Sequence, residues 1–235
     1  MKIDNIKVYG LAESIVASGF PMLENYDEHN FSLDSSFVFK DLEKKELDDN
    51  FKKHLERAKK LASCKGGESH DCALCGIIVQ MNITAPRYWW QEMSRYHFFD
   101  IVSSTSTMHR LKSFLKKAIE LKRETLAPKY QGENDAIDYE KNYDYFDLYC
   151  THFSPATSTA VFRAFVDFAE MFLDNDNIEL LKANLPEGWL QTARVTTNYR
   201  QLRTIKRQRK NHRLNEWREF CKWIDSLPMA KELIQ

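Results

Sequence analysis

Apolar and polar side chains alternate along residues 76–84 (GIIVQMNIT), and this pattern constrains the fold more than any other in the chain. Successive side chains of a strand point to opposite faces. One face of this segment would therefore hold Ile77, Val79, Met81 and Ile83. The other face is mostly polar, so the segment is predicted to be a half-buried strand. Pro86 ends this strand, and the aromatic residues 88–90 are expected to lie in a helix that follows.

The rest of the chain is read as strands, helices and connecting segments. Strands are predicted at residues 3–9 and 37–39. Helices are predicted over residues 47–62, 111–124, 159–174, 198–210 and 215–226. The third of these helices is apolar on nearly all sides, which indicates a place in the core or at a subunit contact. The acidic, Tyr- and Asn-rich residues 132–147 are expected to form a loop, and residues 185–188 a turn.

The composition favours one folded domain over residues 1–235. Hydrophobic side chains make up 43% of the 235 residues, which is ample for a buried core. Gly and Pro number only 7 and 6, and no linker, repeat or low-complexity tract interrupts the sequence. No apolar run approaches the roughly 20 residues of a membrane span. The N-terminal residues also lack the apolar core of a signal peptide. We therefore expect a soluble, cytoplasmic protein.

The charges balance over the whole chain but not along it. Lys+Arg and Asp+Glu both number 34, so the net charge gives no argument for a nucleic-acid or membrane partner. Residues 194–218 nevertheless contain nine Lys or Arg and a single acid. On a helix Arg200, Arg203 and Arg207 would share one side. This stretch is open to three interpretations: a solvated face paired with residues 132–147, a phosphate site, or a surface that follows a nucleic-acid backbone.

Five cysteines in a chain of this length do not indicate a disulfide framework. Cys64, His70, Cys72 and Cys75 lie close together in the sequence, and zinc binding is one interpretation of them. Structural zinc sites normally join ligands from two separated segments. Ordinary buried thiols with no metal are therefore the favoured interpretation.

Residues 95–110 combine two histidines, His97 and His109, with hydroxyl side chains from Ser103 to Thr107. Such a run between two helices can be a loop that donates hydrogen bonds to an anion. It can equally be a helix N-cap with a solvated surface. The residues alone leave both open.

Several short motifs follow one another in a definite order. Ser69-His70-Asp71 precedes the strand that ends at Ala85-Pro86, and the aromatic helix comes next. Tyr96-His97-Phe98 is then followed by seven residues and Ser106. This order is similar to that of the flavin-dependent thymidylate synthases, whose signature is Arg-His-Arg, seven residues and then Ser. That family also has a His-rich turn, which contacts the flavin, in the place of residues 69–71.

The downstream motifs extend the resemblance to roughly residues 65–225. The family has a Leu-Pro turn, then Thr-x-Asn-x-Arg, and another Arg about nine residues later. The corresponding residues here are Leu185-Pro186, Thr196-Thr197-Asn198-Tyr199-Arg200 and Arg209. The resemblance implies an α+β fold with a central antiparallel or mixed sheet flanked by helices, and assembly as a homotetramer with sites at subunit contacts.

The resemblance also implies a set of ligand contacts and no catalytic nucleophile, because the family's enzymes bind and orient FAD and a nucleotide. The residues expected at FAD are His70, His97, Asn198, Arg200 and Thr204. The residues expected at the nucleotide are Ser106 and Arg209. No residue is expected to bind metal.

The chain departs from the family pattern at its cationic positions. Tyr96 and Phe98 replace both arginines of the signature, and Met108 replaces the arginine two residues after the serine. Each charge-assisted bond of this kind contributes on the order of 1.5–3 kcal/mol. Arg95 and Arg110 lie near the lost positions, and they are the candidates to replace these contacts.

Three functions follow as hypotheses. The first is a divergent FAD-dependent enzyme that transfers a one-carbon group to C5 of dUMP or another pyrimidine nucleotide. It would use methylenetetrahydrofolate and NADPH, as the family does. The second is a non-catalytic relative that binds a nucleotide or a partner without flavin chemistry. The third is a nucleic-acid binder that uses residues 194–218, against which the zero net charge counts.

Overall fold

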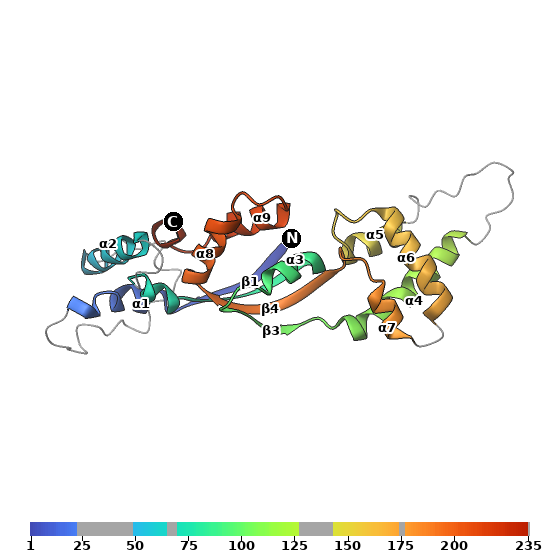
Figure 1. The fold of residues 1–235 in the computed structure, drawn as a ribbon, viewed down its shortest axis with the longest axis horizontal. Coiled ribbons are helices and arrows are strands. Elements are labelled where there is room, and N and C mark those ends of the chain that lie inside the picture. The colour runs from blue at the N-terminus through green and yellow to red at the C-terminus, as the bar shows by residue number, and fades with distance from the viewer. Residues whose placement is uncertain (23–48, 65–69, 127–142, 174–176, 235) are drawn as a thin grey trace. The chain divides into compact units, whose positions relative to one another are not determined.

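The computed structural model describes residues 1–22, 49–64, 70–126, 143–173 and 177–234, and Figure 1 shows their arrangement. The strands are β1 (Lys2–Tyr9), β2 (Ile78–Pro86), β3 (Phe99–Ser104) and β4 (Leu190–Asn198). The helices are α1 (Leu11–Ala17), α2 (Asp49–Ser63), α3 (Arg87–Met93), α4 (Thr107–Leu126), α5 (Tyr143–His152), α6 (Thr159–Phe172), α7 (Ile178–Ala183), α8 (Tyr199–Arg209), α9 (Asn215–Ile224) and α10 (Ala230–Leu233). Two 3₁₀ turns are η1 (Phe20–Met22) and η4 (Cys72–Cys75).

The strands form a four-stranded antiparallel sheet in the order β1-β2-β4-β3. The alternation at residues 76–84 is confirmed, because Ile77, Val79, Met81 and Ile83 are all buried. β4 pairs with β2 and buries Ala193, Val195 and Thr197 on the same alternating pattern. β3 is an edge strand whose side chains after Phe99 are all exposed.

Contacts divide the described residues into two compact units. Unit 1 comprises residues 1–83, 94–102 and 194–235, and unit 2 comprises residues 84–93 and 103–193. β2, β3 and β4 each contain residues of both units, so the chain passes repeatedly from one to the other. The expectation of one domain over residues 1–235 stays a prediction.

Unit 1 is built around the C-terminal helices. α8 packs against α9 and against η4, while α2 packs against α1 and α10. The apolar face of α9 places Trp217, Phe220 and Ile224 in the core with almost no exposed surface. These contacts fix α8 in position, and α8 contains five of the nine Lys and Arg residues of the basic stretch at residues 194–218.

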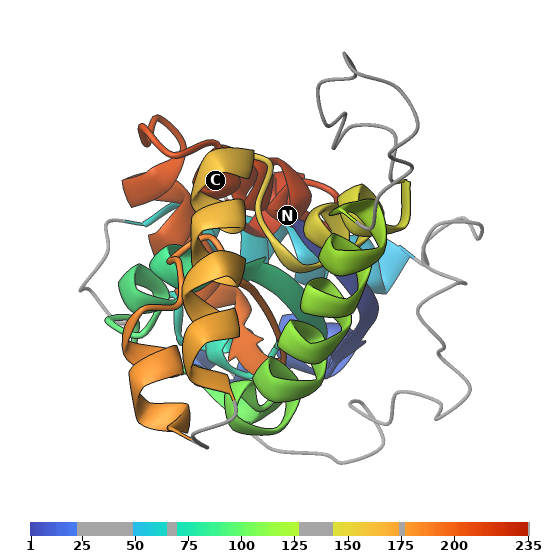
Figure 2. The same ribbon diagram turned by 90° about the vertical axis from the view of Figure 1, so that its right-hand side faces the viewer.

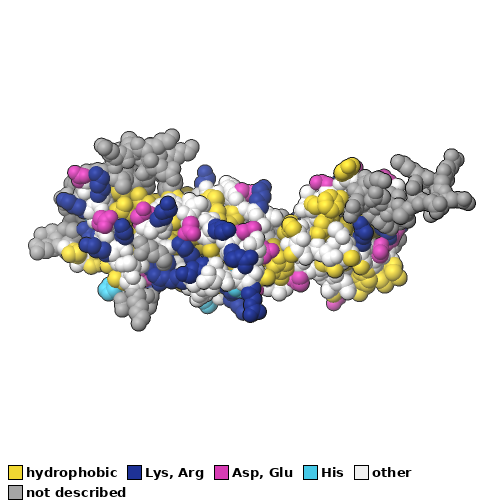
Figure 3. Space-filling view, turned by 90° about the horizontal axis from the view of Figure 1, so that it is seen from above, with side chains coloured by type: hydrophobic (Ala, Val, Ile, Leu, Met, Phe, Trp, Pro, Cys, Tyr) yellow, Lys and Arg dark blue, Asp and Glu magenta, His cyan; other side chains and the backbone are white. Residues whose placement is uncertain are grey.

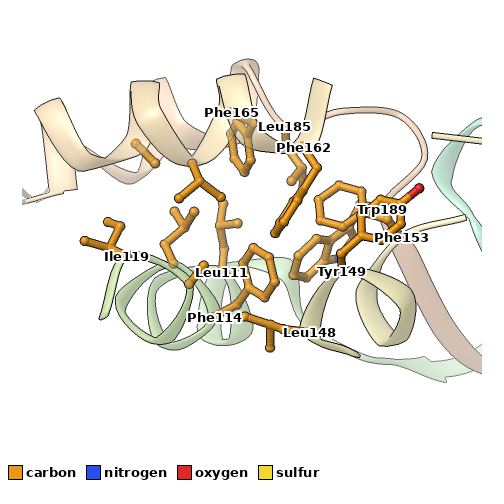
Figure 4. Packing of buried hydrophobic residues seen from close by; sticks show 14 of the residues in the cluster. Leu111, Phe114, Ile119, Leu148, Tyr149, Phe153, Phe162, Phe165, Leu185 and Trp189 are labelled. Atoms are coloured by element: carbon orange, nitrogen blue, oxygen red, sulfur yellow. The ribbon is translucent and has the colours of Figure 1, made fainter. Parts of the chain in front are cut away.

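Unit 2 has a helical core. α4 contacts α5, α6 and α7, and Figure 2 shows α4 and α6 side by side. Aromatic residues from four segments meet in the centre of this unit (Figure 4), and they include Phe114 of α4, Tyr149 and Phe153 at the end of α5, Phe162 of α6, and Trp189 before β4. One face of α6 joins this cluster. Two other apolar residues of the helix, Val161 and Met171, are exposed. The prediction that α6 lies in a core is therefore confirmed for one of its faces.

Most predicted elements are confirmed, with small shifts at their ends. The strand at residues 3–9, all five predicted helices and the helix after Pro86 are present. The loop predicted at residues 132–147 is wrong at its end, because residues 143–147 begin α5; the preceding residues 132–142 lie outside the described part. The strand predicted at residues 37–39 also lies outside it. None of the described helices is long and apolar enough to cross a membrane.

Candidate functional site

A buried carboxylate, Asp71, joins the turn before β2 to helix α8. Arg203 donates a hydrogen bond from Nη2 to Asp71 Oδ2, and a second from Nη1 to the carbonyl of Ala62. Asp71 and Arg203 are only 4% and 3% exposed. Burial lowers the pKa of Arg203, because desolvation disfavours its charged form. The buried pair therefore depends on close contact between the two charges.

Arg200 lies on the solvent side of the same carboxylate. Its Nη2 atom is 3.2 Å from Asp71 Oδ1, and its Nη1 atom donates to Cys75 Sγ at 3.8 Å. The Arg200 side chain is 37% exposed, so part of it remains accessible to a ligand. Asp71 Oδ1 is buried, and no group among the described residues forms a well-directed hydrogen bond to it, despite the short distance to Arg200. This acceptor and the half-exposed cation beside it form the polar centre of the candidate site.

His70 precedes Asp71 and is itself exposed. It contributes to the lining of a cavity of about 10 Å³ together with Ser14, Ala58, Leu61, Leu74 and Ile77. A cavity of that size holds at most about one water molecule. A flavin ring would therefore have to bind on the surface beside His70 and Arg200 and not in this cavity.

Asn198 and Thr204 have local roles in α8. Asn198 is the N-cap residue, and its Oδ1 accepts a hydrogen bond of 2.9 Å from the backbone N–H of Gln201. Thr204 is exposed, and its hydroxyl donates to the carbonyl of Arg200. Asn198 therefore orients the first turn of the helix, which includes Arg200.

A second cluster surrounds Arg209 at the other end of α8. Arg209 Nε donates to the hydroxyl of Tyr96 at 2.7 Å, and its guanidinium lies 4.6 Å from the ring centre of Trp217. Its Nη1 atom is 2.8 Å from His212 Nε2, and the Tyr96 hydroxyl donates to Gln208. Tyr96 is the residue that replaces the first signature arginine, so the structure brings the signature segment against Arg209.

The residues on either side of Tyr96, namely Arg95, His97 and Phe98, project into solvent. Arg95 and His97 are exposed, and Phe98 is 68% exposed with a φ of 57°. A bulky residue in this left-handed conformation stores roughly 1–3 kcal/mol of strain. Phe99 then turns inward and packs edge-on against Phe220 of α9. The segment is thus anchored on both sides of an exposed turn.

Ser106 and Arg110 belong to unit 2 and lie at the start of α4. Ser106 Oγ accepts from the N–H of His109, and its carbonyl accepts from the N–H of Arg110. Of the two interpretations of the hydroxyl-rich run, the helix N-cap is thus the one whose hydrogen bonds are present. Arg110 lies 5.8 Å from the ring centre of Trp189.

Internal contacts occupy much of the basic stretch at residues 194–218. Arg194 donates to the carbonyl of Asn5 across the sheet, and Lys206 forms an ion pair with Asp225. Arg218 donates to two carbonyls of the turn before α9. Lys and Arg side chains are interspersed with Asp and Glu on the face of unit 1 visible in Figure 3. These contacts favour a structural role for much of the stretch over a continuous nucleic-acid surface.

Among the described residues, no group of three or more His, Cys, Asp or Glu side chains could hold a metal ion. Cys64, His70, Cys72 and Cys75 are all described, and the four do not converge on one point. The prediction that these thiols are buried is wrong, because Cys72 is exposed and Cys64 and Cys75 are only partly buried.

Sequence reasoning missed the central role of Asp71 and the contact between Tyr96 and Arg209. Asp71 was visible only as the residue after His70, and no spacing rule links it to α8, more than 120 residues away. In the sequence, Tyr96 indicates only the loss of a charge. Its contact with Arg209 depends on how the segment before β3 packs against α8, which the local sequence does not encode.

Of three comparisons with known proteins, the one with solved structures gives matches, and these support the fold. No family model matches the chain, and no curated protein matches it either. Among solved structures, the flavin-dependent thymidylate synthase ThyX from Helicobacter pylori, complexed with FAD and dUMP, matches with a TM-score of 0.60 and 15% identity, over 100% of this chain and 97% of that one. The UMP/dUMP methylase PolB from Streptomyces cacaoi, bound with 5-Br dUMP, matches with a TM-score of 0.53 and 12% identity, over 98% and 91% of the two chains. The predicted α+β fold is thereby confirmed.

Proposed function

We propose that the chain is a divergent FAD-dependent enzyme that acts on a pyrimidine nucleotide, by methylation of dUMP or a related one-carbon transfer to C5. The main support is the ion pair between Asp71 and Arg200. It joins the two segments, residues 69–71 and α8, in which the resemblance independently expects flavin contacts. The fold neighbours include proteins solved with FAD and dUMP, and with 5-Br dUMP.

The polar groups beside Asp71 fit a flavin nucleotide. Arg200 offers a half-exposed guanidinium, which suits the pyrophosphate of FAD. The buried acceptor Asp71 Oδ1 lacks a well-directed donor, and the flavin and adenine rings both have N–H groups that donate. His70, Thr204 and His97 are exposed and available for further contacts. Bound FAD would supply hydride transfer, while the residues of this chain bind and orient it.

Arg209 is the proposed contact for the nucleotide. Its guanidinium is partly buried against Tyr96 and Trp217, which would fix its orientation and offer aromatic faces nearby. Ser106 and Arg110 are further proposed contacts for the nucleotide. Methylenetetrahydrofolate and NADPH are the proposed one-carbon donor and reductant, and the cytoplasm the proposed location.

The geometry of α8 favours assembly into an oligomer. Arg200 and Arg209 are nine residues apart, which is about two and a half helical turns and about 13 Å along the axis. They therefore lie on opposite sides of α8. A flavin at Arg200 and a nucleotide at Arg209 of the same chain would have this helix between their binding groups. A homotetramer, in which sites form at subunit contacts, is the proposed state that removes this difficulty.

A non-catalytic relative is the second candidate, and the packing of Arg209 favours it. The Tyr96 hydroxyl, the Trp217 ring and His212 already contact this arginine. Such a site can bind a nucleotide or another anion without any flavin chemistry.

The first experiment is the visible absorption spectrum of the purified chain, recorded before and after addition of FAD and desalting. A retained flavin spectrum is the expected result. A chain that stays colourless after both treatments would contradict the enzyme proposal and leave the non-catalytic candidate.

The role of Arg200 is tested by Arg200→Ala, with FAD affinity measured by fluorescence titration. Loss of one charge-assisted contact should weaken FAD binding about 10- to 150-fold, the equivalent of about 1.5–3 kcal/mol. Lys210→Ala is the matched control, because it removes the same charge from an exposed position at the end of α8. Equal affinities of the two variants would contradict the assignment of Arg200.

The role of Arg209 is tested by the thermal shift that dUMP and UMP produce. Arg209→Ala should abolish the nucleotide shift while FAD binding persists, because the two arginines lie on opposite sides of α8. Arg209→Lys retains the charge but lacks the planar fork, and it should give a reduced shift. A nucleotide shift that persists in both variants would rule out Arg209 as the contact.

A further inference from the structure

We propose that Cys72 and Cys75 are a redox-active dithiol that a low-molecular-weight disulfide, such as oxidised glutathione, converts to an intramolecular disulfide. Both residues belong to the single 3₁₀ turn η4. A 3₁₀-helix has three residues per turn and rises about 2 Å per residue, so residues three apart lie on the same side with Cα atoms about 6 Å apart. Disulfides require Cα atoms about 4.4–6.8 Å apart, and the separation expected for such a turn falls within that range.

The two thiols differ in exposure in the way that such a pair requires. Cys72 is exposed, and Cys75 is half-buried against α8, where it accepts a hydrogen bond from Arg200. Cys72 can therefore meet an external reagent, while Cys75 lies three residues further along the same turn, with its sulfur in contact with Arg200. Cys221 contrasts with both, because it is buried and its pKa is raised to about 11, which makes it unreactive.

The exchange takes place in two steps. The Cys72 thiolate attacks one sulfur of oxidised glutathione, whose S–S bond breaks and releases one glutathione thiolate. The Cys75 thiolate then attacks the Cys72 sulfur of the mixed disulfide and expels the second glutathione thiolate. The two protein thiols are oxidised by two electrons, the small disulfide is reduced, and the two released thiolates take up the two protons.

Oxidation would also affect a neighbouring side chain. Arg200 donates to the Cys75 sulfur and pairs with Asp71. A disulfide repositions this sulfur towards Cys72 and so weakens its contact with Arg200. The dithiol proposal itself does not rest on FAD binding and would hold for a chain without flavin.

The test uses peptide mapping of the whole folded chain. The reduced protein is incubated with oxidised glutathione, alkylated with N-ethylmaleimide and digested with trypsin. Cleavage after Lys65 and Arg87 releases residues 66–87, which contain both Cys72 and Cys75 but not Cys64. The expected peptide is unalkylated and lighter by two hydrogen atoms than its reduced form.

Three variants make the result specific. Cys75→Ser should accumulate glutathione on Cys72, because no resolving thiol remains. Cys72→Ser should yield Cys75 alkylated, and Cys150→Ser, which changes an exposed cysteine on α5, should form the disulfide as the wild type does. Stable glutathione on Cys72 in the wild type, alkylation of both thiols, or a crosslink to Cys64 would each overturn the proposal.

Discussion

Asp71 is the residue on which the charged centre of unit 1 depends. It faces two arginines of α8, of which Arg203 is almost fully buried. Removal of one partner from a buried ion pair costs about 3–5 kcal/mol, because an uncompensated charge remains inside the protein. Asp71→Asn should therefore lower the free energy of unfolding in urea by about that amount.

A matched control separates burial from charge. Asp225, directly after α9, forms an ion pair with Lys206 of α8. The side chain of Asp225 is 50% exposed, in contrast to that of Asp71. Exposed ion pairs contribute about 0–1 kcal/mol, so Asp225→Asn should change the urea midpoint only slightly. If Asp71→Asn were no more destabilising than Asp225→Asn, the buried pair would not be a structural centre.

At the scale of the element, the first turn of α8 depends on its cap. Asn198 accepts from the N–H of Gln201, and loss of such a cap costs about 0.5–2 kcal/mol. Asn198→Ala should lower the free energy of unfolding by about that amount, measured in urea. Asn198→Ser retains a capping oxygen and should recover most of the loss. A Ser variant as unstable as the Ala variant would point to a role for Asn198 other than capping.

The sequence predicts secondary-structure elements well where the hydrophobic periodicity is strong. It predicts them poorly where an element forms only through packing against its neighbours. β2 alternates cleanly, and its buried face is identified correctly from the sequence alone. β4 has a comparable alternation that was overlooked, with Ala193 and Val195 inward. β3 follows no such pattern, because both of its faces are exposed after Phe99. Edge strands of this kind form through pairing with a neighbour, which their own side chains do not signal.

At the scale of the whole molecule, the sequence predicts which segments contribute to the candidate site, but not which of their side chains meet. The order of short motifs predicts that α8 and the segment around His70 and Asp71 act together. It does not reveal which side chains meet, since the contacts Asp71–Arg200 and Tyr96–Arg209 span 129 and 113 residues of chain. Such contacts follow from packing in three dimensions. The zero net charge likewise gave no indication that internal ion pairs occupy so many of the basic side chains.

The stability of the molecule should also respond to pH through His152. Burial against Phe114 and Trp189 lowers the pKa of His152 from 6.5, and the nearby charges of Arg110 and Lys117 lower it further, although the hydrogen bond to the Leu148 carbonyl opposes them. Below about pH 6.5 the unfolded chain therefore binds a proton that the folded chain binds only at lower pH. The free energy of unfolding contributed by this group is fully present above that pH and decreases as the pH falls through it.

The pH dependence of His152 is tested with His152→Gln, which cannot take up this proton. Urea midpoints of the wild type should fall between pH 7.5 and pH 5.5, and the fall should be smaller in the variant, whatever its absolute stability. The comparison of slopes is needed because Gln also disturbs the aromatic cluster and lowers stability at every pH. Parallel slopes in the two proteins would show that the cluster does not hold His152 in its neutral form, and the acid sensitivity would then arise from other groups.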